Sequence, residues 1–174
     1  LLFASLIAAP SYISFWTALR FYNLTDQLPM HIMIASKKSK KEKNFFDTKI
    51  KFYKLRYFWG YKKARYEKFD IFIAEPEKCI LDSLLTQLVP LSEIVKAVDS
   101  KEINLEKLKE FTIKTKNKSL IKRVGFLLEK KGINTDALLK HIDYNYIKLD
   151  TNHKKQGEKN KKWRIINNLT NDLT

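Results

Sequence analysis

Glycine, proline and cysteine are all scarce in this chain of 174 residues. Four Gly and four Pro are too few for the frequent turns of an all-β sandwich, and the glycines lie too far apart for a loop that cradles nucleotide phosphates. The single cysteine, Cys79, excludes an internal disulfide framework and a cysteine-based zinc module, and it fits a reducing cytoplasm. The composition therefore indicates a cytoplasmic protein, and we expect no cofactor.

Residues that carry catalysis or bind metal are also sparsely placed. The histidines His31, His141 and His153 do not have metal-ligand spacing. The one Glu-x-Lys sequence, residues 129–131, falls at the end of an expected helix, where a solvent-exposed role is simpler than a nuclease site. Cys79 lies on the core side of an apolar helix and is expected to be a buried hydrophobe. We therefore expect no enzyme. The alternative, a metal-dependent nuclease, would use carboxylates such as Asp70, Glu75 or Glu77.

Charge is absent from residues 1–19, a run about as long as a membrane-spanning helix. Pro10 interrupts the run, and aromatic residues, among them Phe15 and Trp16, gather at its centre rather than at its two ends. We therefore expect no membrane partner. The pattern favours a hinge and a proline break, followed by a serine-capped helix that packs against a sheet.

Lysine and arginine outnumber aspartate and glutamate by 34 to 19, giving a formal net charge of +15. More than half of this excess lies in residues 37–70, which contain 13 basic and 4 acidic residues. A basic segment with interleaved aromatics can bind phosphates and stack bases. In the alternative, the aromatics pack the inner face of a sheet and the lysines reflect a lysine-rich proteome. The candidate nucleic-acid-binding residues are Lys37, Lys38, Lys40, Lys41, Lys43, Lys62, Lys63 and Arg65.

Hydrophobic periodicity predicts an α+β fold. Alternating residues predict a small mixed or antiparallel sheet over residues 30–74, joined by C-terminal strands at 144–150 and 163–167. Within it, Lys62–Arg65 is expected to be a basic turn. Helical spacing predicts helices at 14–22, 76–88 and 104–131. The expected core residues are Phe15, Trp16, Leu19, Tyr22, Leu81 and Leu84.

Six short motifs occur in a distinctive order along the chain. They are PSYISFWTALRFYNLTDQLP (10–29), FWG (58–60), IAEPEKCILDSL (73–84), RVGFLLEKKGI (123–133), YIKLD (146–150) and WRIIN (163–167). In this order, over residues 8 to about 168, the chain resembles the AbiEi-type antitoxin family of type IV, abortive-infection toxin–antitoxin systems.

The resemblance implies a bacterial or archaeal transcriptional regulator and antitoxin. The family layout places a winged helix-turn-helix before a C-terminal domain that counters a nucleotidyltransferase-like toxin. We therefore expect residues 1–9 to be a residual linker, 10–168 the C-terminal antitoxin domain, and 169–174 a frayed tail. The expected partners are DNA, through non-specific backbone contacts, and the cognate toxin. The alternatives are the nuclease above and a purely protein-binding module.

Overall fold

The computed structural model describes residues 10–169, which form an α+β fold with two sheets. The expected linker, 1–9, and all of the expected tail except Leu169 lie outside the described residues. The larger sheet contains β1 (Ser11–Ile13), β2 (Ile32–Ser36), β3 (Lys43–Phe45), β4 (Thr48–Lys54), β5 (Tyr61–Tyr66) and β6 (Phe69–Ala74). The smaller sheet contains β7 (Ile147–Lys148), β8 (Glu158–Asn160) and β9 (Ile165–Asn167). The helices are α2 (Phe15–Phe21), α3 (Pro76–Thr86), α4 (Leu91–Val98), α5 (Leu105–Lys114), α6 (Lys118–Lys130) and α7 (Asp136–Leu139).

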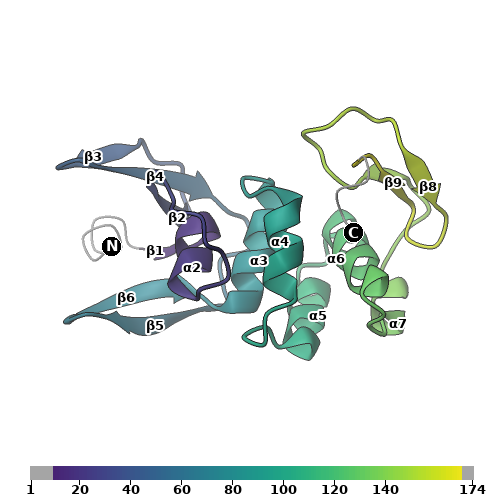
Figure 1. Ribbon diagram of the computed structural model, residues 1–174, viewed down its shortest axis with the longest axis horizontal. Coiled ribbons are helices and arrows are strands. Elements are labelled where there is room, and N and C mark those ends of the chain that lie inside the picture. The colour runs from purple at the N-terminus through teal and green to yellow at the C-terminus, as the bar shows by residue number, and fades with distance from the viewer. Residues whose placement is uncertain (1–9, 170–174) are drawn as a thin grey trace.

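The larger sheet is mixed, with the strand order β3-β4-β2-β1-β6-β5. β1 pairs antiparallel with β2 and parallel with β6, while β2 pairs parallel with β4. The hairpins β3–β4 and β5–β6 therefore form the two opposite edges of the sheet. Strand twist makes them diverge, so that they project as two separate arms from the same end of the molecule (Figure 1).

The central strand β1 was not expected, because a hinge and a proline break at Pro10 were predicted to lead directly into the serine-capped helix. Pro10 directly precedes the strand, where its missing N–H removes no sheet hydrogen bond. Tyr12 and Ile13 are fully buried. The strand has only three residues, too short for alternation to be recognised, and both of its faces are covered. The opening aromatic run thus enters the middle of the sheet.

The helix after β1 begins where it was predicted, but Ser14 does not cap it with its side chain. Ser14 occupies the N-cap position, while its hydroxyl donates to Asp82 on α3. Of the expected core residues, four are buried and two, Trp16 and Tyr22, are half-buried against the core. The helices α3, α5 and α6 also lie within the expected ranges.

The smaller sheet lies at the end of the molecule away from the hairpins (Figure 1). β7 and β9 fall inside the two expected C-terminal strands, whereas β8 lies between them, where no strand was expected. β9 is the central strand, pairing parallel with β7 and antiparallel with β8. Within residues 10–169, none of the helices has both the length and the apolar character needed to cross a bilayer.

Candidate nucleic-acid interface

The eight candidate cations do not form one continuous patch. Lys37, Lys38, Lys40 and Lys41 lie in the loop that follows β2, and Lys43 begins β3. The other three, Lys62, Lys63 and Arg65, lie on β5. Because β3 and β5 are the two outermost strands of the sheet, segments that are close in the sequence belong to opposite edges.

The expected basic turn at Lys62–Arg65 is wrong, because these residues lie within β5. Tyr61–Tyr66 pairs in continuous register with Phe69–Ala74, so the turn falls at Glu67 and Lys68. Successive side chains of a strand point to opposite faces. Lys62 therefore lies on one face of the hairpin, and Lys63 and Arg65 lie on the other.

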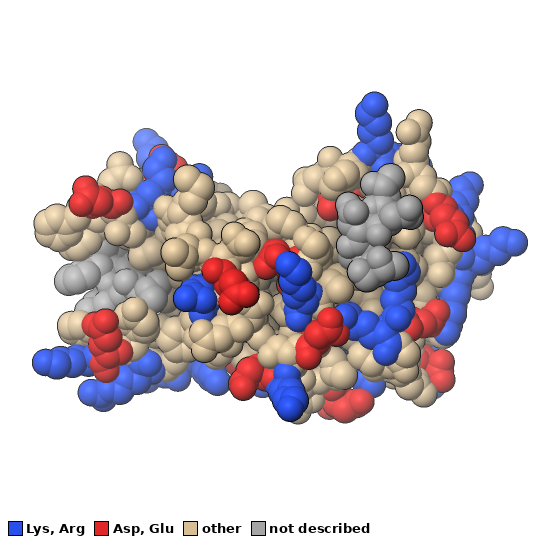
Figure 2. All heavy atoms as spheres, viewed as in Figure 1, with Lys and Arg blue, Asp and Glu red and all other residues tan. Residues whose placement is uncertain are grey.

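The basic charge of residues 37–70 is exposed on both hairpins and the loop beside them. All of its 13 cations are exposed except Lys40 and Lys51, which are half-buried. Two of the cations form ion pairs, Lys49 with Glu42 at 3.1 Å and Lys63 with Asp70 at 2.6 Å. Figure 2 shows Lys and Arg side chains along both hairpins with a few carboxylates between them. The hairpins therefore present cations to solvent in numbers that their own acids do not neutralise.

Most aromatics threaded through this segment pack inward, as the alternative interpretation predicted. Tyr61 stacks on Tyr12 with ring centroids 4.7 Å apart, and Phe58 contacts both rings. The exceptions lie at the hairpin ends. Phe46 is 89% exposed at the end of β3–β4, and Phe69 is 45% exposed at the end of β5–β6. Tyr66, beside the same turn as Phe69, is 38% exposed, so these three rings are the aromatics of residues 37–70 that are exposed to a partner.

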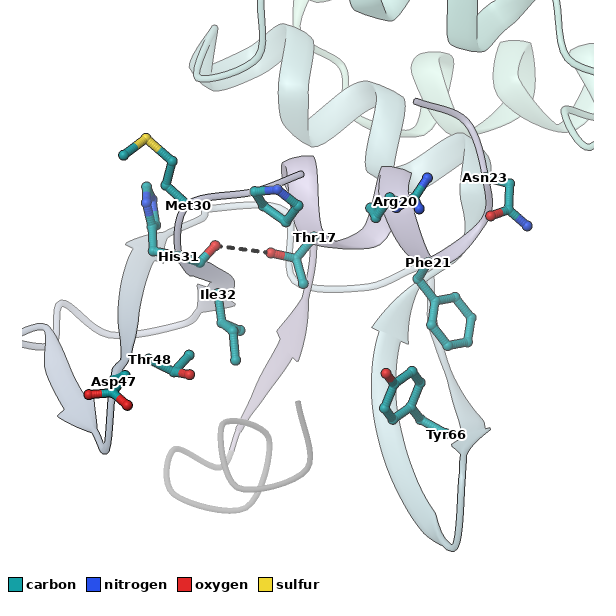
Figure 3. A pocket seen from close by; sticks show the side chains of 11 residues that line it. Thr17, Arg20, Phe21, Asn23, Met30, His31, Ile32, Asp47, Thr48 and Tyr66 are labelled. Atoms are coloured by element: carbon teal, nitrogen blue, oxygen red, sulfur yellow. Dashed lines mark hydrogen bonds between the residues drawn. The ribbon is translucent and has the colours of Figure 1, made fainter. Parts of the chain in front are cut away.

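A cleft of about 570 Å³ separates the two hairpins. Phe21 on α2 and Tyr66 on β5 approach each other on one side, with ring centroids 6.3 Å apart, and Thr48 lies on the opposite hairpin (Figure 3). Arg20 and His31 add two basic side chains to the lining. The complete lining is Thr17, Arg20, Phe21, Asn23, Pro29, Met30, His31, Ile32, Asp47, Thr48 and Tyr66.

The cleft could not be recognised in the sequence, because its residues come from four separate segments. His31 is its titratable base, and its imidazole Nε2 lies 3.4 Å from the Tyr53 hydroxyl. Burial, and then the nearby charges of Lys51 and Lys49, hold the His31 pKa below its ordinary value. The imidazole is therefore neutral at neutral pH, and Arg20 supplies the fixed positive charge of the lining.

The carboxylates of the nuclease alternative have other partners. Asp70 pairs with Lys63, and a hydrogen bond from that ammonium lowers the Asp70 pKa. Glu75 and Glu77 both contact Lys107 on α5, and Glu77 also accepts the Asn104 N–H at 2.9 Å. Within residues 10–169, no three His, Cys, Asp or Glu side chains gather as a metal site would require. Glu75 and Glu77 therefore fasten α3 to α5, and Asp70 pairs within the β5–β6 hairpin.

Two of the sequence motifs meet in a buried polar cluster that sequence reasoning missed. The Lys78 cluster consists of Tyr12, Ser14, Lys78 and Asp82, which join β1 and the start of α2 to α3. The Lys78 ammonium pairs with Asp82 and donates to the Tyr12 hydroxyl at 2.9 Å, and Asp82 accepts from Tyr12 at 3.0 Å and Ser14 at 2.9 Å. The side chains of Lys78 and Asp82 are each 1% exposed.

Burial dominates the electrostatics of this cluster. It raises the Asp82 pKa, while the Lys78 charge and the hydrogen bonds from Lys78, Ser14 and Tyr12 act in the opposite direction. It also raises the pKa of the adjacent Cys79 thiol, which is fully buried as expected and therefore poorly suited to act as a nucleophile. The only sequence signal was the four-residue spacing of Lys78 and Asp82, which places them on one helix face.

The remaining C-terminal motifs meet around Trp163, which is fully buried. Gly125 on α6 faces its ring so closely that a β-carbon there would lie 2.1 Å from two ring atoms. Arg123 donates to the backbone carbonyls of Leu149 at 3.0 Å and Lys148 at 3.1 Å. We refer to Trp163, Gly125 and Arg123 as the Trp163 cluster. Their contacts attach the smaller sheet to α6.

These features define an α+β domain with two basic hairpins and two buried motif clusters. Neither the known family models nor the curated proteins include a match to this chain. Among solved structures, the chain is similar to the crystal structure of the RV2827C protein from Mycobacterium tuberculosis. The TM-score is 0.63 at 14% sequence identity, over 90% of this chain and 61% of that protein. The chain thus spans less than two thirds of the length of that protein, and the similarity establishes a shared fold.

Proposed function

We propose that the chain is the C-terminal domain of an AbiEi-type antitoxin and transcriptional regulator, which contacts nucleic-acid backbone through its two basic hairpins. The ordered motifs support the family assignment. The observation that carries the nucleic-acid contact is the exposure of eleven of the 13 cations in residues 37–70. Phosphate contacts release counterions from the nucleic acid, so a surface of this kind binds with little dependence on base sequence.

Binding to duplex DNA is expected to weaken steeply as salt rises. In the variant Lys62→Gln/Lys63→Gln/Arg65→Gln, the slope of log affinity against log salt should fall by about 1 for each cation that contacts a phosphate. The measurement is fluorescence anisotropy with a labelled duplex of about 20 base pairs, titrated at several salt concentrations between roughly 50 and 200 mM.

The matched control is Lys101→Gln/Lys116→Gln/Lys140→Gln, which removes the same charge from exposed positions outside the hairpins. It should leave the salt slope near that of the unmodified chain. A flat salt dependence of the unmodified chain, or an equal loss in both triple variants, would show that the hairpins do not make the contact.

The proposal predicts that a nucleotidyltransferase-like toxin is encoded beside the gene for this chain, and co-expression of the chain with that toxin tests the antitoxin activity. Relief of growth arrest by the chain is the expected result. Continued arrest with a folded, abundant chain would contradict the proposed activity, whatever the DNA result.

A purely protein-binding module is the second candidate, and the exposed apolar side chains favour it. Seven large hydrophobic residues within 10–169 are exposed. Six of them lie on the hairpins or in the loop before β2: Leu28, Met30, Phe46, Tyr66, Phe69 and Phe72. Co-purification with the toxin-like protein, together with no binding to duplex DNA at low salt, would select this candidate.

A further inference from the structure

An exposed row of aromatic and basic side chains lies on the smaller sheet. The Arg164 guanidinium is 5.7 Å from the centroid of the Tyr144 ring and 5.6 Å from that of Tyr146. The Lys159 ammonium also lies 5.6 Å from the centroid of the Tyr146 ring. The row therefore alternates in the order Tyr144, Arg164, Tyr146, Lys159. We refer to these four residues as the Tyr–Arg row.

The outer end of the row is open to solvent. Tyr144 is 87% exposed, although a phenol ring of this size ordinarily buries part of its surface. Tyr146 and Arg164 are half-buried, and the Arg164 Nη1 donates to the Tyr146 hydroxyl at 3.4 Å. The inner ring and the guanidinium are thus held in place, while the face of the outer ring remains accessible.

The turn that presents Arg164 is rigid and strained. Its neighbour Trp163 is fully buried in the Trp163 cluster, and the Trp163 N–H donates to the Asn160 side chain at 2.8 Å. Arg164 itself has a φ of +53°, in the left-handed region that favours glycine. A non-glycine residue held there points to a role for its side chain, because such strain persists only where the surrounding structure enforces it.

The charge around the row suits a polyanion. Residues 142–169 contain seven basic and three acidic residues. Two of the three acids already have a basic partner. Asp143 pairs with Lys122, and the Asp150 carboxylate lies 3.3 Å from the His153 Nδ1. The third acid, Glu158, is adjacent to Lys159 on β8 and so points to the opposite face of the strand.

We propose that the Tyr–Arg row binds single-stranded nucleic acid by stacking unpaired bases on Tyr144 and holding the phosphates with Arg164 and Lys159. Rings on which bases stack, set among cations that follow the backbone, are how proteins bind single strands without sequence preference. The row lies at the end of the molecule away from the hairpins (Figure 1). This site does not depend on the function proposed for the hairpins.

The test is fluorescence anisotropy of the full chain with labelled ten-nucleotide oligo(dT) and oligo(U). Tyr144→Ala should weaken binding by about 5- to 150-fold, the range for loss of one stacked base. Tyr144→Phe keeps the ring and should bind within about twofold of the unmodified chain. Leu28→Ala, which shortens an exposed apolar side chain in the loop before β2, is the matched control and should leave the affinity for both oligonucleotides unchanged.

Arg164→Gly separates binding from stability. Glycine relieves the left-handed strain, so the thermal midpoint should stay the same or rise, while single-strand affinity falls. The proposal is overturned if the unmodified chain binds neither oligonucleotide at low salt, or if Tyr144→Ala binds both as well as the unmodified chain. If Tyr144→Ala loses affinity for either oligonucleotide, the proposal is supported. The oligonucleotide whose binding is lost then shows whether the ligand is DNA or RNA. Tyr144→Ala should leave the salt slope for duplex DNA unchanged, so this result and the hairpin result can fail separately.

Discussion

Replacement of Asp82 by leucine is expected to lower the free energy of unfolding by about 3–5 kcal/mol, because it leaves the buried Lys78 ammonium without its charge partner. Both side chains are only 1% exposed, so water cannot replace the lost contact. The hydroxyls of Tyr12 and Ser14 lose their acceptor at the same time. Equilibrium unfolding in urea, followed by tryptophan fluorescence, measures the change.

The double variant Lys78→Met/Asp82→Leu tests the reason for this loss. Removing both charges leaves no ion to desolvate, and buried pairs replaced by apolar side chains of similar volume are often close to neutral. The double variant should therefore be more stable than Asp82→Leu alone. Asp70→Asn, at an exposed ion pair, is the matched control and should produce no measurable change. If Asp82→Leu behaves like that control, the cluster does not hold the sheet to α3.

The helices show what local pattern can predict in this chain. The start of α3 is marked by Pro76 in its first turn with Glu77 beside it, and its buried face follows the spacing of apolar residues. The ends of α6 are marked in the same way. Asn117 accepts the Leu120 N–H at 3.1 Å as a cap, and Gly132 takes a φ of +72° beyond the last turn. Each signal lies within a few residues of the feature that it predicts.

The sheet shows where this local information ends. The turn of the β5–β6 hairpin contains no Gly, Asn or Pro, and Glu67 takes a φ of +54° there. Without a typical turn residue, the clustered charges of Lys62–Arg65 resembled a turn more than the true turn did. Strand order is harder still to predict, because no local pattern could show that β2 and β1 would lie between two hairpins that are close in sequence.

The candidate cations do not form one patch for the same reason. Counting charge along the chain correctly found the segment with the largest excess, but the sheet divides that segment between its two edges. The Tyr–Arg row went unnoticed because Tyr144 and Arg164 are twenty positions apart and only the pairing of β7 with β9 brings them together. Contacts between strands distant in sequence decide both cases.

A methyl group added at Gly125 is expected to have the second large effect. Alanine normally stabilises a helix interior relative to glycine by about 1 kcal/mol. Here its β-carbon would lie 2.1 Å from the Trp163 ring, which is fully buried and cannot move aside. Overpacking of this kind should reverse the sign, so that Gly125→Ala loses about 3 kcal/mol of unfolding free energy. Urea unfolding followed by far-ultraviolet circular dichroism measures it without relying on the fluorescence of the neighbouring ring.

Two variants separate the clash from effects of the backbone. Gly132→Ala adds the same methyl group where no atom lies within 4 Å, so its cost, about 1 kcal/mol, reflects only the left-handed backbone. In Gly125→Ala/Trp163→Leu, the ring atoms that collide are absent, so the double variant should be more stable than the sum of the two single changes predicts, by about 1–3 kcal/mol. Additive single changes would mean that Gly125 is required for some reason other than the approach of Trp163. A coupling of the expected size would show that α6 and the smaller sheet, and with it the turn that presents Arg164, depend on this one contact.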